Sequence, residues 1–99
     1  MTSKIQAELN SSRRVRKRSD IDIIASILNE AHKGARKTRI MYRCNLSHRQ
    51  LQVYLKLLLG MGFLVSHSDK DSSKLGLLKT TAKGLKFLDA YRTLKDLMN

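Results

Sequence analysis

The chain has 99 residues, of which 41% are hydrophobic, and one cysteine, Cys44. This length predicts one small domain with a limited core, which folds alone or gains stability by dimerising. The lone cysteine excludes an internal disulfide and fits a reducing cytoplasm. No signal-type N-terminus and no long apolar run is present, so we expect neither secretion nor a membrane span. Twenty Lys and Arg against eight Asp and Glu give a formal charge of +12, which favours nucleic acid as the partner, ahead of an anionic membrane.

The first predicted segment, residues 1–18, is a basic flexible arm. Its cationic run contains Arg13, Arg14, Arg16, Lys17 and Arg18. Basic arms of DNA-binding domains lie along phosphates or enter a minor groove, so these five residues are candidate DNA contacts. The alternative is a solvated tail without a folded role.

Two short helices are predicted next. The first covers residues 20–34, with a cap at Ser19 or Asp20, an end at Gly34, and a buried stripe of Ile21, Ile24, Ile27, Leu28 and Ala31. The second covers residues 37–45, with Thr38 as its cap and with Ile40, Met41 and Cys44 buried. Because only Leu46 and Ser47 separate it from the helix that follows, we expect a helix-turn-helix.

The third predicted helix, residues 47–60, is the recognition helix of this motif. Its apolar face is Leu51, Tyr54, Leu55, Leu58 and Leu59, which recur at helical spacing. Ser47 and Gln50 have the spacing of a capping box, and Gly60 or Gly62 is placed to end the helix. The polar residues fall on the opposite face, as in a helix that enters a major groove.

A hairpin and a fourth helix complete the predicted chain. The β-type runs FLVSHS and LGLLKT flank a polar turn at residues 69–74, which would be the tip of a wing. Thr80 or Thr81 caps the last helix, in which Phe87, Tyr91, Leu94 and Met98 follow the 4, 3, 4 spacing of a helix that pairs with another helix. We expect a homodimer through this stripe; the alternative is a helix folded onto its own core.

The segments KTRIMYRCNLS, GFLV and TTAKGLKFL are similar to those of the small archaeal winged-helix DNA-binding proteins. Over about residues 19–98 the chain resembles the 10a-type chromatin proteins of Sulfolobus and related predicted transcriptional regulators. The resemblance implies a mainly α fold with a small β-hairpin (α+β), in which a winged helix-turn-helix at residues 19–79 binds double-stranded DNA. It further implies that the helix at residues 80–99 dimerises the protein as an antiparallel coiled coil.

Candidate contacts with DNA follow from residue type and position. On the recognition helix, Arg49 can pair with guanine and Gln52 with adenine, and Val53 can touch a thymine methyl or simply pack. The flanking candidates on this helix are Ser47, His48 and Lys56. Phosphate contacts are assigned to Lys37, Thr38 and Arg39 on the second helix, with Arg43 as a weaker candidate, and to Lys70, Ser73 and Lys74 in the wing. For the wing residues, an ordinary solvent loop is the alternative.

Other chemistry has little support in the sequence. Cys44 and His48 lack the further ligands of a zinc site, and no nucleophile set or phosphate loop is evident, so we expect no cofactor, no small-molecule ligand and no enzymatic activity. We expect a nucleoid-associated transcriptional regulator in the cytoplasm. A non-specific architectural chromatin protein is the second reading, and a winged-helix protein-interaction module is the third. RNA is less favoured because only five aromatic side chains are present.

Overall fold

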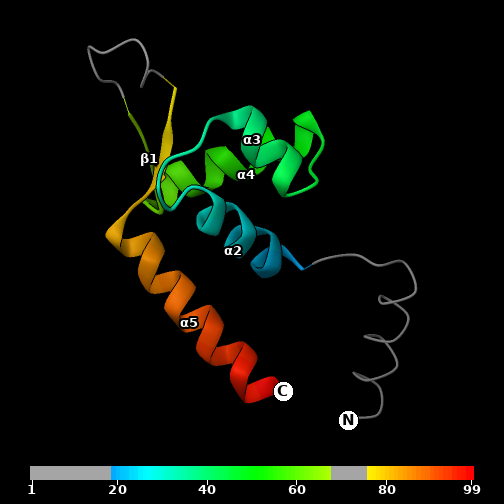
Figure 1. Ribbon diagram of the computed structural model, residues 1–99, viewed down its shortest axis with the longest axis vertical. Helices are drawn as coiled ribbons and strands as arrows, with labels where there is room; N and C mark the ends of the chain where they lie inside the picture. The colour runs from blue at the N-terminus through cyan, green and yellow to red at the C-terminus, as the bar shows by residue number, and fades with distance from the viewer. Residues whose placement is uncertain (1–18, 68–75) are drawn as a thin grey trace.

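The structure, a computed structural model, describes residues 19–67 and 76–99 (Figure 1). The elements are helices α2 (Asp20–Glu30), α3 (Lys37–Arg43) and α4 (His48–Met61), strands β1 (Leu64–Ser66) and β2 (Leu78–Thr80), and helix α5 (Ala82–Met98). This mainly helical arrangement with one antiparallel hairpin confirms the predicted winged-helix fold class.

Helix α2 is the centre of the core. Ser19 caps it, because its hydroxyl accepts from the amide of Asp22, and Ile27 and Leu28 are fully buried. The prediction that Ile21 belongs to the buried stripe was wrong, since its side chain is 46% exposed and only the residues from Ile23 onward face the core. The helix ends at Glu30, before the predicted end, and Gly34 occupies a left-handed conformation in the turn that follows.

Helix α3 is shorter than predicted and begins without a side-chain cap. The proposed cap at Thr38 was wrong: the helix starts at Lys37, and Arg36 is the N-cap residue with no side-chain cap hydrogen bond. After Arg43 the chain turns through Asn45, which has a φ of 54°. Asparagine tolerates this left-handed region better than most residues, and the turn lets the buried Leu46 anchor the junction to α4.

The hairpin pairs Leu64 with Thr80 and Ser66 with Leu78 in an antiparallel register. Ala35 adds an isolated bridge to Leu78, which ties the α2–α3 connection to the hairpin. Both strands are shorter than the predicted β-type runs, and the predicted turn at residues 69–74 falls within the part of the chain that the structure does not describe.

Helix α5 packs against α2 and then continues beyond the other helices (Figure 1). Its N-cap is Thr81, whose hydroxyl accepts a hydrogen bond from the amide of Gly84. Of the two predicted caps, Thr80 and Thr81, the second is therefore correct. Leu88 is buried, and the rings of Phe63 and Phe87 lie 5.4 Å apart between their centroids. The first half of α5 is therefore part of the core of its own domain.

Candidate nucleic-acid interface

The start of α4 is fixed by a capping box. The Ser47 hydroxyl accepts from the Gln50 amide at 3.1 Å, and the Gln50 side chain accepts from the Ser47 amide at 2.9 Å. This confirms the predicted pattern. At the other end, Gly62 is the left-handed C-cap, so α4 extends through Gly60 to Met61. Both ends of the helix are therefore capped, which satisfies backbone groups that would otherwise lack partners.

The two faces of α4 differ as the sequence predicts. Leu51, Leu55 and Leu58 are buried in the core, whereas the predicted contact residues are exposed, namely Ser47, His48, Arg49, Gln52, Val53 and Lys56. Val53 is 62% exposed, so it does not pack in the core. Leu59, which was predicted on the buried face, is exposed. The free face therefore presents a mixture of cationic, amide and apolar groups.

The four predicted phosphate contacts on α3 divide into two pairs. Lys37 and Thr38 line a hollow of about 200 Å³ that lies between α3 and α4. Arg39 and Arg43 instead pair with Glu30 of α2, with N–O distances of 3.5 Å and 3.8 Å. One carboxylate thus lies beside two guanidinium groups and offsets part of their charge, so Arg39 and Arg43 are weaker candidates for phosphate contact than Lys37.

A second hollow, of about 360 Å³, lies along the other edge of the α4 face. Its lining includes Arg49, Val53 and Leu57, together with Tyr54, whose hydroxyl donates to Asp20 at 2.6 Å. The sequence pattern placed Tyr54 among the buried residues, but it is only half-buried and holds α4 against the start of α2.

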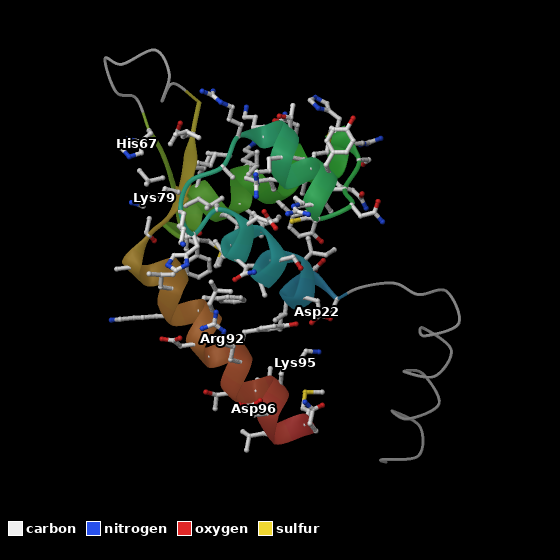
Figure 2. All side chains as sticks on the ribbon, viewed as in Figure 1. Asp22, His67, Lys79, Arg92, Lys95 and Asp96 are labelled. Carbon is white, nitrogen blue, oxygen red and sulfur yellow. The ribbon has the colours of Figure 1, made fainter. Side chains whose placement is uncertain are left out.

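The hairpin adds one exposed cation that was not among the predicted contacts. Lys79 is exposed on β2 and lies opposite Val65, and His67 follows β1 close by (Figure 2). The sequence did contain a signal for this residue. Side chains alternate between the two faces of a strand, which places Lys79 outward between the buried Leu78 and Thr80. The predicted wing contacts Lys70, Ser73 and Lys74, and the whole predicted arm, lie outside the described residues.

The charges are unevenly distributed along the chain. No Asp or Glu occurs between Glu30 and Asp69, so α3 and α4 carry only cationic formal charges. The described carboxylates belong to α2 and α5. A polyanion would therefore meet mainly cationic side chains on α3 and α4, and the neighbouring carboxylates are Glu30 and Asp20 of α2.

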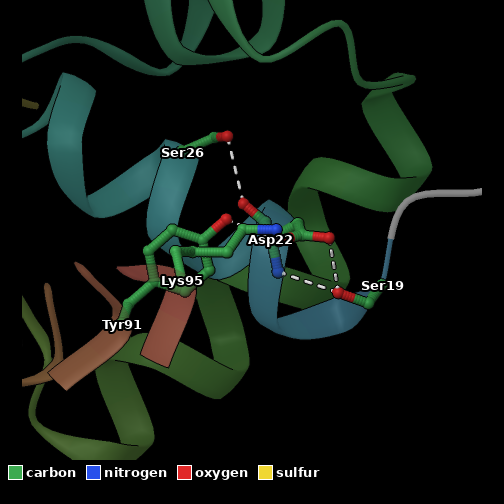
Figure 3. Close-up of polar contacts among 5 residues, drawn as sticks. All are labelled: Ser19, Asp22, Ser26, Tyr91 and Lys95. Atoms are coloured by element: carbon green, nitrogen blue, oxygen red, sulfur yellow. Dashed lines mark hydrogen bonds and ion pairs between the residues drawn. The ribbon is translucent and has the colours of Figure 1, made fainter. Parts of the chain in front are cut away.

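Asp22, in the first turn of α2, joins α2 to α5 (Figure 3). It accepts from the hydroxyls of Tyr91 and Ser19 and pairs with the Lys95 ammonium group at 3.4 Å. The hydrogen bond from Tyr91, followed by that from Ser19, lowers the pKa of Asp22, and the same contact with Asp22 raises the pKa of Tyr91. This group fixes the position of α5.

Within the described residues, no cluster of three or more His, Cys, Asp or Glu side chains could hold a metal ion. In the same part of the chain, every helix is too short or too polar to cross a bilayer.

The winged-helix arrangement agrees with a match to a known protein family. Residues 17–99 match the family model described as winged helix-turn-helix. The chain is also 33% identical over 91 residues to an uncharacterized protein of the archaeon Methanocaldococcus jannaschii, and the match covers 91% of this chain and 86% of that protein. The chain belongs to the winged helix-turn-helix family.

Proposed function

From its place in the winged helix-turn-helix family, we propose that this protein binds double-stranded DNA by inserting α4 into the major groove. One observation carries the proposal: Arg49, Gln52 and Lys56 are exposed together on a capped helix whose opposite face is core. Arg49 donates to a guanine edge, Gln52 pairs with adenine, and Val53 contacts a thymine methyl group. Each good bidentate contact would discriminate against the wrong base by about 1–3 kcal/mol.

Phosphate contacts position this helix in the groove. Lys37 and Thr38 supply the main ones from α3, because their side chains lie beside the start of α4. Arg39 and Arg43 contribute less, since each pairs with Glu30. The proposal also assigns backbone contacts to the arm at residues 1–18 and to the wing tip, which lie outside the described residues.

We further propose that the protein dimerises through the end of α5. Of the four predicted interface residues, Phe87 and Tyr91 are half-buried against their own domain. Leu94 and Met98 are 44% and 70% exposed, and Leu97 beside them is 80% exposed. The exposed side chains at the end of α5 support the proposal that residues 80–99 dimerise the protein while residues 19–79 bind DNA, as the resemblance to 10a-type chromatin proteins implies.

Substitution of the α4 face tests the DNA-binding proposal. We expect the combined change Arg49→Ala, Gln52→Ala and Lys56→Ala to weaken binding to a duplex and to reduce the salt dependence, because two cations are lost. The matched control is Lys86→Ala with Arg92→Ala, which removes two exposed cations from α5. Equal weakening by the two variants in a fluorescence anisotropy titration would contradict the proposal.

The regulator and the architectural protein differ in sequence specificity. A regulator is the first candidate because Arg49 and Gln52 can read bases. The architectural role is favoured by the formal charge of +12 and by the absence of carboxylates between Glu30 and Asp69. Selection from a random-sequence duplex pool separates them. A recurrent motif bound at least about a thousandfold more tightly than an arbitrary duplex indicates a regulator, whereas uniform binding with a steep salt slope indicates the architectural role. Either role would place the protein on the nucleoid in the cytoplasm.

A further inference from the structure

The hollow between α3 and α4 joins residues that the sequence assigned to separate tasks. Lys37 and Thr38 border it from α3, His48 borders it from the first turn of α4, and Met41 and Leu51 complete its lining. Lys37, Thr38 and His48 are exposed, Met41 is half-buried and Leu51 is buried. The hollow is therefore apolar inside and has cationic or hydrogen-bonding groups at its border.

This combination fits only part of the DNA backbone. A phosphate gains nothing from contact with a methionine and a leucine, because burial against hydrocarbon removes its hydration without supplying a partner. The carbon face of a deoxyribose loses little hydration there and makes van der Waals contacts. The phosphates on either side of that sugar would meet the Lys37 ammonium group and the side chains of Thr38 and His48.

We propose that this hollow seats one deoxyribose of the DNA backbone, with its two flanking phosphates held at the border. The sugar packs on Met41, above the buried Leu51, one phosphate pairs with Lys37 and Thr38, and the other contacts His48. The proposal rests on the proposed function, and it adds a backbone subsite that sets how deeply α4 enters the groove.

An apolar seat and a phosphate contact respond differently to salt. Replacement of Met41 removes a contact with neutral atoms, so it weakens binding without altering the number of counterions released. Replacement of Lys37 removes one neutralised phosphate, so it weakens binding and also lowers the slope of log K against log salt by about 0.9. Because every nucleotide carries the same sugar, the loss caused by a Met41 substitution is equal for all duplex sequences.

The test compares two methionines in full-length protein. We expect Met41→Gln to weaken binding about three- to tenfold on several unrelated duplexes with an unchanged salt slope. Met41→Leu keeps an apolar seat of similar volume and retains wild-type binding. Met61→Gln is the matched control, because Met61 is exposed near the end of α4 and outside this hollow, and it leaves binding unchanged.

Three results would overturn the proposal. The first is a Met41→Gln protein that binds DNA like the wild type, and the second is an equal loss of affinity in Met41→Leu. The third is a loss of affinity confined to certain duplex sequences, which would place a base in the hollow. If Met41→Gln fails to fold, the methyl resonance of Met41 in the wild-type protein decides instead. We expect that addition of duplex shifts the methyl resonance of Met41 and leaves the methyl resonance of Met61 in place. An unshifted Met41 resonance would contradict the proposed deoxyribose site. The proposed function fails separately, when the triple α4 variant still binds duplexes like the wild type.

Discussion

Gly84 lies in α5 where the helix passes close to the end of α4. A Cβ atom at this position would lie 2.5 Å from the carbonyl oxygen of Phe63 and 2.6 Å from Cγ2 of Thr80. Helix propensity alone favours alanine over glycine by about 1 kcal/mol, but the close backbone contact reverses this preference. The glycine is therefore needed for the packing of α5.

We predict that Gly84→Ala lowers the free energy of unfolding by about 1–3 kcal/mol, because α5 must move away from Phe63. Gly60→Ala is the control, since Gly60 is also helical but has no neighbour within 4 Å of the added Cβ atom. It should stabilise the protein by roughly 0.5–1 kcal/mol. Urea unfolding of both variants checks the prediction, and a Gly84→Ala protein as stable as Gly60→Ala would contradict it.

Asp22 makes the stability of the domain depend on pH at both extremes. Its folded pKa lies below the ordinary value of 3.8, chiefly because of the hydrogen bond from Tyr91, so its stabilising effect is present above that value and is lost as the pH falls through the folded pKa. The raised pKa of Tyr91 acts in the opposite range: its contribution is present below the ordinary value of 10.0 and is lost as the pH rises through the folded pKa.

We predict that Asp22→Asn is less stable than the wild type at neutral pH and loses less further stability as the pH is lowered below 3.8. Asp89→Asn removes a carboxylate from the exposed side of α5 and serves as the control. Thermal unfolding followed over a pH series measures the difference. If the unfolding temperatures of the wild type and Asp22→Asn fall in parallel as the pH is lowered, this carboxylate does not cause the loss of stability in acid.

At the scale of elements, residues 80–84, which run from the end of β2 into α5, make hydrogen bonds with backbone groups near the ends of three helices. The Thr80 hydroxyl donates to the carbonyl of Leu28 in α2 at 2.6 Å. Thr81 caps α5 and donates to the carbonyl of Gly62, and the Lys83 ammonium group donates to the carbonyl of Met61 at the end of α4. The segment TTAKG thus fixes α2, α4 and α5 relative to one another.

We predict that Thr80→Val destabilises the protein by about 1–3 kcal/mol, because it leaves the carbonyl of Leu28 without its hydroxyl donor inside the core. Thr80 is buried, so water does not readily replace the hydroxyl. Thr80→Ser keeps the donor and should be the less destabilised of the two in calorimetry. A valine variant more stable than the serine variant would show that the methyl group matters more than the hydrogen bond.

The sequence predicted those parts of the fold that local signals control. The capping box of Ser47 and Gln50 and the helical spacing of Leu51, Leu55 and Leu58 depend on residues a few positions apart, and the structure confirms them. The exposure of Ile21 and the Asp22–Tyr91 contact depend on where α5 lies, and Asp22 and Tyr91 are 69 positions apart. Likewise, Glu30 could be recognised as the partner of Arg39 and Arg43 only from the packing of α2 against α3.

At the scale of the whole molecule, the two proposed tasks occupy different regions. Helices α3 and α4 carry no Asp or Glu of their own, whereas the end of α5 carries exposed apolar side chains and extends beyond the other helices (Figure 1). A dimer formed through α5 would therefore leave both copies of α4 available to one duplex or to two.

We predict that Leu94→Glu combined with Met98→Glu shifts the protein toward the monomer mass in sedimentation equilibrium, because buried carboxylates would repel each other across the interface. Lys86→Glu introduces a charge change on α5 outside the proposed interface and should preserve the dimer. The wild type sedimenting as a monomer at all concentrations would contradict dimerisation through this helix.

We propose that α4 and the adjacent start of α3 form the DNA-binding surface. Amide chemical-shift changes during titration with a duplex test it most directly, because they locate the contact without any substitution. We expect the largest changes at residues 37–38 and 47–56, with small changes in the second half of α5. The largest changes along α5 or the outer side of α2, with residues 47–56 unaffected, would contradict the account.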